Sequence, residues 1–292
     1  MTVVTRQSQD PVGQFAAGNE YVSRQEGFSH DASVGPGDGE GLPPHNSSVP
    51  DWSILTEDEI FEKFDNDFGH LKPILDGLPT DFNRQERRQI AELLLRNSGS
   101  FSASEFDIGC TNLLQQRINT GNHPPISEPL RRHPRAHLDL IDDTVSKLQE
   151  AGVVEPAISP WAANVVLVKK KDSDVPRVTI DYRKLNAVTV KDKHPLPRIK
   201  DCLDALSGST LFTTCDVSMS FYSLPLAPED RPKTAFVTRR GQFQFRRSPM
   251  GIANSPAAFS RLMALALRGL TYLIALTFVD DVIIVGEIFQ NI

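Results

Sequence analysis

The sequence predicts an α+β protein. Short runs of β-branched and aromatic residues alternate irregularly with helical patterns, without the regular strand-helix-strand order of a parallel α/β sheet. The chain has 292 residues, of which 39% are hydrophobic and 23% are charged. This length and composition can bury a sizeable core, so a collagen-like chain or one disordered throughout is excluded.

Composition divides the chain into four segments. Residues 1–50 are rich in Gly, Ser, Pro and acidic residues and lack a sustained apolar period, so we expect a disordered leader. Residues 51–100 are expected to form a short helical segment. Residues 101–135 end in a proline-rich stretch and are expected to form an extended approach segment. The main folded unit is expected at 136–292.

Periodicity and capping signals mark the helices. Thr56 with Glu59 three residues later is a capping-box signature. Asn254 before Ser255 and Pro256 is typical of an N-cap followed by Pro in the first helical turn. Helices are therefore predicted at 56–68, 83–96 and 138–148, and after Pro256.

Apolar runs with β-forming residues predict the strands. One hairpin is expected within 167–186, and a second is expected from 273–279 and 282–286. The strand-like runs in the rest of the main unit are 163–168, 177–182, 211–217, 234–238 and 242–246.

The net charge of -6 hides an asymmetry. Residues 1–100 carry 8 basic and 17 acidic residues, a net charge of -9, whereas residues 101–292 carry 23 and 20, a net charge of +3. The stretch 169–200 holds ten basic and four acidic residues, and 231–247 holds six basic and none acidic. Both clusters can attract phosphates whatever the total charge, although a charge run is more often an exposed face without a ligand.

Compartment signals favour the cell interior. The three cysteines are scattered, and neither a signal peptide nor an apolar run long enough to cross a membrane is found. We therefore expect an intracellular protein, in a cytoplasmic particle or the nucleus, with no membrane partner.

Three aspartates stand at the ends of apolar strands. Asp280 and Asp281 interrupt the run LTFVDDVIIV, and Asp216 ends the run LFTTCD. Desolvated carboxylates without cations are costly in a strand interior, while a solvated acidic turn is the alternative explanation of the pair. If these strands are neighbours in one sheet, the three carboxylates converge as oxygen ligands for a hard divalent cation such as Mg²⁺, as in nucleotidyl transfer.

Taken in order, these segments resemble the reverse transcriptase domain of LTR retrotransposons of the Ty3/gypsy type. The resemblance runs from about residue 105 to residue 287. It rests on GVVEPAISPWAANVVLVKKKD, RVTIDYRKLNAVTVKDKHPLPRI, LFTTCDVSMSFYSLPL, SPMGIANSPAAFSRLM and FVDD. It implies the fingers and part of the palm of a right-hand polymerase, with an antiparallel palm sheet flanked by helices.

The resemblance implies an RNA-directed DNA polymerase that adds dNTPs to a primer 3′-hydroxyl on an RNA or DNA template. Asp216, Asp280 and Asp281 are the implied catalytic and metal-binding residues for two Mg²⁺ ions, with Mn²⁺ as an alternative. In the intact polyprotein, RNase H and integrase regions are implied as partners of the same chain.

Further residues are implied to bind substrates. Lys170 and Arg177 match positions that grip the phosphates of the incoming dNTP. Phe221 matches the bulky residue that blocks a 2′-hydroxyl, and Met250 and Gly251 match the loop beside the nucleotide. The basic residues expected to contact nucleic acid are Lys169, Lys171, Arg183, Lys233, Arg239 and Arg240.

Departures from the family pattern leave alternatives open. The departing residues are Met219, Ser220, Ser223, Arg247 and Ser248. None of these departures removes an implied metal ligand. The chain also ends at Ile292, eleven residues after Asp281 and before the implied thumb, so we expect weak or undetectable processive synthesis. A catalytically dead relic, a host-adopted nucleic-acid-binding module and an unrelated carboxylate metal nuclease are the alternatives.

Overall fold

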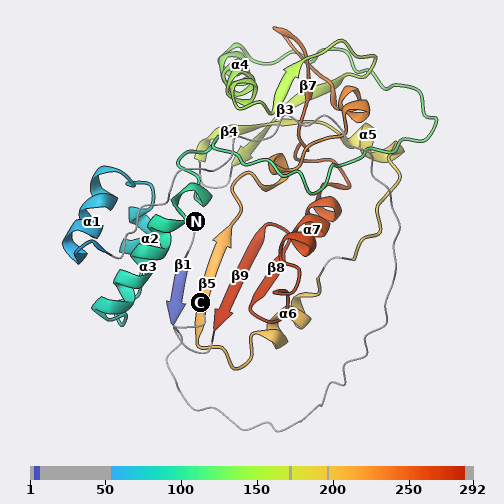
Figure 1. Ribbon diagram of the computed structural model, residues 1–292. Helices are drawn as coiled ribbons and strands as arrows, with labels where there is room; N and C mark the ends of the chain where they lie inside the picture. The colour runs from blue at the N-terminus through green and yellow to red at the C-terminus, as the bar shows by residue number, and fades with distance from the viewer. Residues whose placement is uncertain (1–2, 7–53, 171–172, 196, 287–292) are drawn as a thin grey trace, which may run out of the picture.

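The computed structural model of the protein describes residues 3–6, 54–170, 173–195 and 197–286. These residues form two β-sheets and a unit of short helices (Figure 1). Helices and strands are mixed along the chain without strict alternation. The α+β class predicted from the sequence is therefore confirmed.

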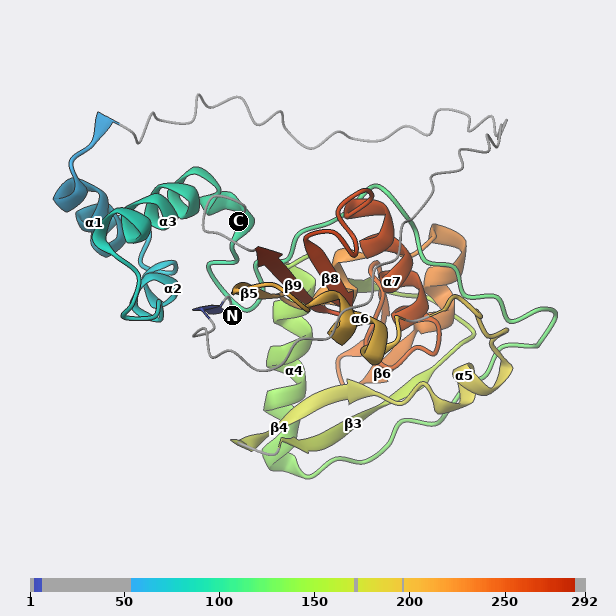
Figure 2. The same ribbon diagram turned by 90° about the horizontal axis from the view of Figure 1, so that it is seen from below.

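The helical unit stands at one end of the molecule (Figures 1 and 2). Its apolar core draws on residues 55–101, and Ile60, Phe64 and Leu95 at its centre are almost fully buried. Its packing therefore does not depend on either sheet. Its elements are α1 (Glu57–Asn66), α2 (Lys72–Asp76), α3 (Arg84–Arg96) and the 3-10 turn η2 (Ser98–Ser100).

Both longer helices of this unit begin with a capping box, as the sequence predicts for the first. The Thr56 hydroxyl accepts a hydrogen bond from the Glu59 N–H, and the Glu59 carboxylate accepts one from the Thr56 N–H at 2.7 Å. Asn83 and Glu86 make the same reciprocal pair at the start of α3, at 2.9 Å each. Each box satisfies amide donors that the first helical turn leaves unpaired.

The first sheet has four antiparallel strands in the order β1-β5-β9-β8. Its strands are β1 (Val3–Arg6), β5 (Leu211–Asp216), β8 (Ala275–Phe278) and β9 (Asp281–Gly286). Two helices contact β8, namely α6 (Ile199–Ala205) and α7 (Ser255–Ala266) (Figure 1). The strands expected near 211–217, 273–279 and 282–286 are confirmed.

Strand β1 corrects part of the expectation for the leader. Residues Val3–Arg6 pair antiparallel with 211–214 of β5. Three consecutive β-branched residues favour the extended conformation, and the outer edge of β5 offers backbone groups that another strand can satisfy. The expectation of disorder over 1–50 is therefore wrong for this strand, while 7–50 lie outside the described residues.

The second sheet is mixed, in the order β2-β7-β6-β3-β4, with a parallel pairing only between β3 and β6 among its described strands. Helix α4 (Arg135–Glu150), predicted from the sequence, packs on this sheet. Its residues Ile141, Val145 and Leu148 are buried in one apolar core with residues of the sheet. Neither α4 nor any other described helix combines the length and the apolar character needed to cross a bilayer. The strands are β2 (Val154–Pro156), β3 (Ala163–Lys170), β4 (Ser173–Ile180), β6 (Phe236–Thr238) and β7 (Gly241–Phe245).

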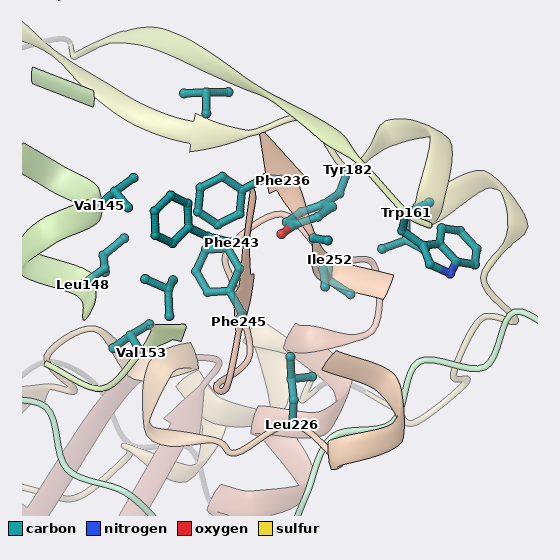
Figure 3. Packing of buried hydrophobic residues seen from close by; sticks show 14 of the residues in the cluster. Val145, Leu148, Val153, Trp161, Tyr182, Leu226, Phe236, Phe243, Phe245 and Ile252 are labelled. Carbon is teal, nitrogen blue, oxygen red and sulfur yellow. The ribbon is translucent and has the colours of Figure 1, made fainter. Parts of the chain in front are cut away.

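The main core lies between α4 and this sheet (Figure 3). Phe236 packs against Phe243 and Phe245, with ring centroids 5.9 and 5.4 Å away. Tyr182 is almost fully buried and donates its hydroxyl proton to a backbone carbonyl at 2.8 Å, and burial raises its pKa. Trp161 is also buried here, which supports a packing role for it.

A buried carboxylate holds the approach segment to the body. Asp230, in the 3-10 helix η4 (Pro228–Thr234), is 3% exposed. It accepts hydrogen bonds from Arg117 Nε at 2.8 Å, the Ile118 N–H at 2.9 Å and Lys233 Nζ at 2.7 Å. Burial opposes ionisation of Asp230, but these donors outweigh that effect and lower its pKa.

Replacing Asp230 by Asn should lower the free energy of unfolding by about 3 kcal/mol, because Arg117, Lys233 and the Ile118 N–H would no longer donate hydrogen bonds to a buried negative charge. Since the pKa is lowered in the folded state, this contribution is present above the ordinary carboxyl pKa and is lost as pH falls through the folded value. Glu229→Gln is the matched control. Glu229 pairs with the same Arg117 at 3.0 Å, but its side chain is 58% exposed, so its loss should stay below about 1 kcal/mol. Urea unfolding measures both, and equal losses would contradict this role for Asp230.

Candidate active site

The pairing of β5 with β9 brings the predicted catalytic aspartates together. Asp216 lies directly opposite Asp281 in this antiparallel pair. The Val217 N–H donates a hydrogen bond to the Asp280 carbonyl at 3.3 Å. The third aspartate, Asp280, therefore lies next to the pair formed by Asp216 and Asp281. The expectation that these strands are neighbours in one sheet is confirmed.

A tight hairpin presents two of the aspartates. Phe278 pairs with Asp281, so Val279 and Asp280 form a two-residue loop between β8 and β9. Val279 has a φ of 57°, in the left-handed region that a β-branched residue rarely adopts. A positive φ at the first position of such a loop matches the twist of the flanking strands. Strained backbone of this kind occurs preferentially at functional sites.

The carboxylates of the three aspartates do not converge, although the sequence predicts that they should. Within the described residues, no three His, Cys, Asp or Glu side chains are arranged to hold a metal ion. Asp216 and Asp281 are direct cross-strand partners and share a face of the sheet, whereas Asp280 lies in the loop between β8 and β9. The backbone therefore brings the three aspartates close together through the pairing of the strands, while their carboxylates are not arranged as a metal-binding group.

The donor chemistry nevertheless fits a hard divalent cation. Asp216 and Asp281 are exposed and Asp280 is half-buried, so solvent and ions can reach all three. Carboxylate oxygens are the ligands that Mg²⁺ prefers in proteins. Like charges at directly opposite positions destabilise a strand pair, so a purely structural role for this arrangement is disfavoured.

The turn after Asp216 carries Phe221. Residues Ser220–Ser223 form the 3-10 turn η3, which follows Met219 in the left-handed conformation, with φ of 47°. The Phe221 ring packs edge-on against Phe259 of α7, with ring centroids 5.9 Å apart. Phe221 is only half-buried, so part of its side chain is accessible near the end of β5, where Asp216 lies.

The loop at 249–254, between β7 and α7, contains Met250 and Gly251. Met250 is half-buried, and Gly251 is exposed with φ of 88°. A Cβ at Gly251 would make only ordinary contact, 3.9 Å from the Ile180 carbonyl oxygen. The backbone conformation, rather than crowding within the protein, therefore requires glycine here.

An amide side chain from α5 (Arg183–Val188) contacts this loop at two points. Asn186 donates from Nδ2 to the Gly251 carbonyl at 2.7 Å and accepts at Oδ1 from the Ala253 N–H at 2.8 Å. Asn186 could not be identified from the sequence, because a single amide residue at the end of the run RKLN forms no recognisable pattern. Its partners lie 65 and 67 residues away along the chain.

Asn254 precedes α7 as predicted, but its side chain does not cap the helix. Its φ of -96° and ψ of 1° lie outside the extended conformation from which an N-cap side chain reaches the first turn. Instead, Nδ2 donates to the Val190 carbonyl at 2.8 Å and Oδ1 accepts from the Asp192 N–H at 3.2 Å. The predicted helix is confirmed, and the predicted side-chain cap is wrong.

Two of the cations predicted on the hairpin of β3 and β4 are exposed, Lys169 and Arg177. Burial raises the pKa of Tyr222 to about 12, and the positive charge of Arg177 opposes this rise. The Arg177 guanidinium is therefore within electrostatic range of η3. Only the backbone of Lys170 is described, at the end of β3, and Lys171 lies outside the described residues.

The other predicted nucleic-acid contacts are engaged within the protein. Arg183 makes a bidentate pair with Asp181, at 2.8 and 2.7 Å. Arg239 pairs with two aspartates of α4, and Arg240 donates to a serine hydroxyl there at 2.7 Å. Lys233 points to the buried carboxylate described above, with 22% of its side chain exposed. It therefore serves the fold, whereas the Arg183 side chain is 83% exposed.

Comparisons with known proteins test the resemblance. Residues 168–290 match the family described as reverse transcriptase (RNA-dependent DNA polymerase). An RNA-directed DNA polymerase homolog from Oenothera berteroana is 39% identical over 115 residues, which cover 39% of this chain and 80% of that relative. The chain belongs to the reverse transcriptase family. The first sheet is accordingly called the palm sheet below, and the second the fingers sheet.

Other relatives of this reverse transcriptase are much longer. The retrovirus-related Pol polyproteins from the Drosophila melanogaster transposons 412 and 297 are 30% and 33% identical, over 74% and 60% of this chain. The chain spans only 18% and 17% of their lengths. Among solved structures, the foamy viral protease-reverse transcriptase in complex with an RNA/DNA hybrid matches with a TM-score of 0.67 and 23% identity, over 75% of this chain and 29% of that one. The reverse transcriptase fold is thus shared.

Several departures from the reverse transcriptase pattern make internal contacts. Arg247 donates to a backbone carbonyl of the approach segment at 2.6 Å. Ser248 is fully buried, and its hydroxyl shares a hydrogen bond with Ser255 at 2.9 Å, while Gln116 donates to Ser255 at 3.2 Å. Ser220 is 4% exposed, so its side chain is buried rather than on the accessible surface beside the aspartates. These substitutions are compatible with the fold.

Arg183→Ala should raise the pKa of Asp181. Hydrogen bonds from Arg183, with a weaker effect of Arg131, lower this pKa from 3.8 to about 2 even though burial acts to raise it. The pair therefore stabilises the fold above pH 3.8, and its contribution is lost as pH falls from there to about 2. In the variant we expect Asp181 to titrate near 3.8 or higher.

Carbon-detected NMR titration of the Asp181 carboxyl group measures the change. Arg131→Ala is the control, because Arg131 lies 3.6 Å from the same carboxylate without a close hydrogen bond. It should give a smaller rise. Equal shifts in the two variants would show that the bidentate pair does not control Asp181.

Proposed function

We propose that the chain is the nucleotidyl-transfer domain of an RNA-directed DNA polymerase, which adds dNTPs to a primer 3′-hydroxyl on an RNA or DNA template. The observation that carries this proposal is the register of β5 and β9, which sets Asp216 opposite Asp281 with Asp280 in the adjoining loop. Such a concentration of like charge is unfavourable unless cations offset it. Phosphoryl-type transfer explains why the charge is retained.

Asp216, Asp280 and Asp281 would hold two Mg²⁺ ions, with Mn²⁺ as an alternative. When bound, the ions supply Lewis acidity at the primer hydroxyl and offset the charge of the triphosphate. The protein contributes position. Two of the three aspartates are anchored by strand pairing before any substrate arrives, so little reorganisation of the backbone is needed at the moment of reaction.

The incoming dNTP would lie between these aspartates and the fingers sheet. Arg177, exposed on β4, is suited, with Lys170 at the end of β3, to bind the triphosphate. Met250 and Gly251 would line the nucleotide site, where the exposed Gly251 offers backbone without a side chain. The dNTP is thus expected to contact both sheets.

Template and primer would contact the exposed cations Lys169 and Arg183 above all, and Arg239 and Arg240 as well. Lys171, which lies outside the described residues, would be a further contact. The solved structures that share this fold include foamy viral enzymes in complex with an RNA/DNA hybrid and with dsDNA. The relatives include the Pol polyprotein from transposon gypsy, 29% identical over 206 residues. These relatives support a Ty3/gypsy-type element as the origin. In the intact polyprotein, RNase H and integrase regions would belong to the same chain.

Asp281→Asn should abolish Mg²⁺-dependent incorporation of a single dNTP, with a fall of roughly 100-fold or more, because a ligand charge at the reacting centre is lost. Binding of a primer-template should survive, since it depends on basic residues and falls with rising salt. Extension of a labelled primer by one nucleotide and fluorescence anisotropy measure the two properties.

Asp201→Asn is the matched control. It makes the same chemical change on an exposed position of α6, outside the β5–β9 pair, and should leave incorporation unchanged. Wild-type incorporation by Asp281→Asn would refute the proposal. A wild-type chain that binds nucleic acid and incorporates nothing would favour the non-catalytic binding module instead.

Phe221→Ala should weaken discrimination against ribonucleotides. The ring, braced by Phe259 at 5.9 Å, would occupy the space that a 2′-hydroxyl needs. We expect the preference for dNTP over rNTP to fall by about tenfold or more, because a small steric difference in a pocket is worth roughly 1–3 kcal/mol. Single-nucleotide kinetics with both substrates measure this ratio. Phe278→Ala, which removes an exposed ring from β8, should leave it unchanged.

A further inference from the structure

The loop at 249–254 is the part of the proposed nucleotide site that most needs a fixed backbone. Gly251 is exposed and left-handed, and it has no side chain of its own with which to pack. The neighbouring Ile252 is buried, so the loop is anchored beside Gly251 but not at it. The position of the Gly251 carbonyl therefore depends on what binds it from outside.

Asn186 supplies that contact with both ends of its amide. Its Nδ2 donates to the Gly251 carbonyl at 2.7 Å, and its Oδ1 accepts from the Ala253 N–H at 2.8 Å. The two bonds span the buried Ile252 and clamp the backbone on either side of it. These two bonds require one donor and one acceptor on a short planar group. A carboxylate or a hydroxyl of the same reach does not provide both in this orientation.

The residue that carries the amide is itself held firmly. The Asn186 N–H donates to the Tyr182 carbonyl at 2.8 Å, and its own carbonyl accepts a hydrogen bond from Lys191. Tyr182 is almost fully buried in the fingers core. Helix α5 follows β4 closely, and β4 carries Arg177. Asn186 thus connects the strand of the proposed phosphate-binding cation with the loop on the other side of the nucleotide.

We propose that Asn186 is a positioning residue that sets the Gly251 backbone against the incoming nucleotide. The inference rests on the proposed polymerase function, and it adds a residue with no direct substrate contact. By fixing the loop relative to α5, the amide keeps both sides of the nucleotide site in one geometry. Its loss should therefore weaken nucleotide binding more than it weakens the fold.

Two substitutions separate the two hydrogen bonds. Asn186→Ala removes both. Asn186→Asp keeps an acceptor for the Ala253 N–H but places a carboxylate oxygen against the Gly251 carbonyl, where donation becomes repulsion. We expect the KM for dNTP in single-nucleotide incorporation to rise about tenfold in both variants, with a smaller change in kcat. If Asn186 only supported the fold, Asn186→Asp would raise the KM for dNTP less than Asn186→Ala does.

Asn164→Ala is the matched control, since the amide of Asn164, on β3, also donates one hydrogen bond and accepts one, to Glu128 and from the Arg131 N–H rather than at the 249–254 loop. It should lower thermal stability at least as much as Asn186→Ala while leaving the KM for dNTP near the wild-type value. An equal rise in KM in Asn164→Ala, or a wild-type KM in Asn186→Asp, would overturn the inference.

Amide hydrogen exchange provides a readout that does not require catalysis. The Ala253 N–H should exchange at least several times faster in Asn186→Ala and at nearly the wild-type rate in Asn186→Asp. Unchanged exchange at Ala253 in Asn186→Ala would overturn the positioning role. If the wild-type chain incorporates no nucleotide while exchange changes as expected, the proposed polymerase function fails and the clamp on the loop stands.

Discussion

The antiparallel register of β5 and β9 is the constraint on which the palm depends. It pairs 211–216 with 281–286 so that both aspartate-bearing ends meet. The β8–β9 hairpin, η3 and β1 are each joined directly to one of these two strands. A register shift of one residue would move every side chain of a strand to the other face, so the apolar residues of β9 and the position of Asp281 are specified together.

Apolar and polar contacts both connect the fingers sheet with the segments next to the palm sheet. Tyr222 of η3, for example, stacks on Phe245 of β7 with ring centroids 6.1 Å apart. The principal apolar cluster lies between α4 and the fingers sheet, while a smaller one, around Phe259 and Leu262, lies between α7 and η3. Between them, Asn186 holds the 249–254 loop and Arg247 reaches both the approach segment and the Tyr222 carbonyl. Directional bonds fix relative orientation more narrowly than apolar contact does, which suits a site built from two sheets.

Local signals in the sequence predicted the elements with enough length to show a period or a cap. Helix α1 with its Thr56 cap, α4 and the two hairpins are examples. Local signals did not predict the elements of only 3 to 7 residues, which are β1, α2, β2, α5 and α6. Elements this short hold at most two turns or a single alternation, and tertiary contacts rather than local periodicity stabilise them.

The sequence by itself determined the class of the fold and the position of three aspartates at the ends of strands, because ordered motifs and acids at strand ends are local patterns. Only the tertiary structure decided which charges are free to act. Lys233 and Arg239 resemble Lys169 in sequence, yet Lys233 is bound to the buried Asp230 and Arg239 is bound to Asp142 of α4. Asn186 and its partners at Gly251 and Ala253 are likewise joined only by folding. A hydrogen bond depends on distance and direction in space, and residues more than 60 positions apart carry no record of either in their order along the chain.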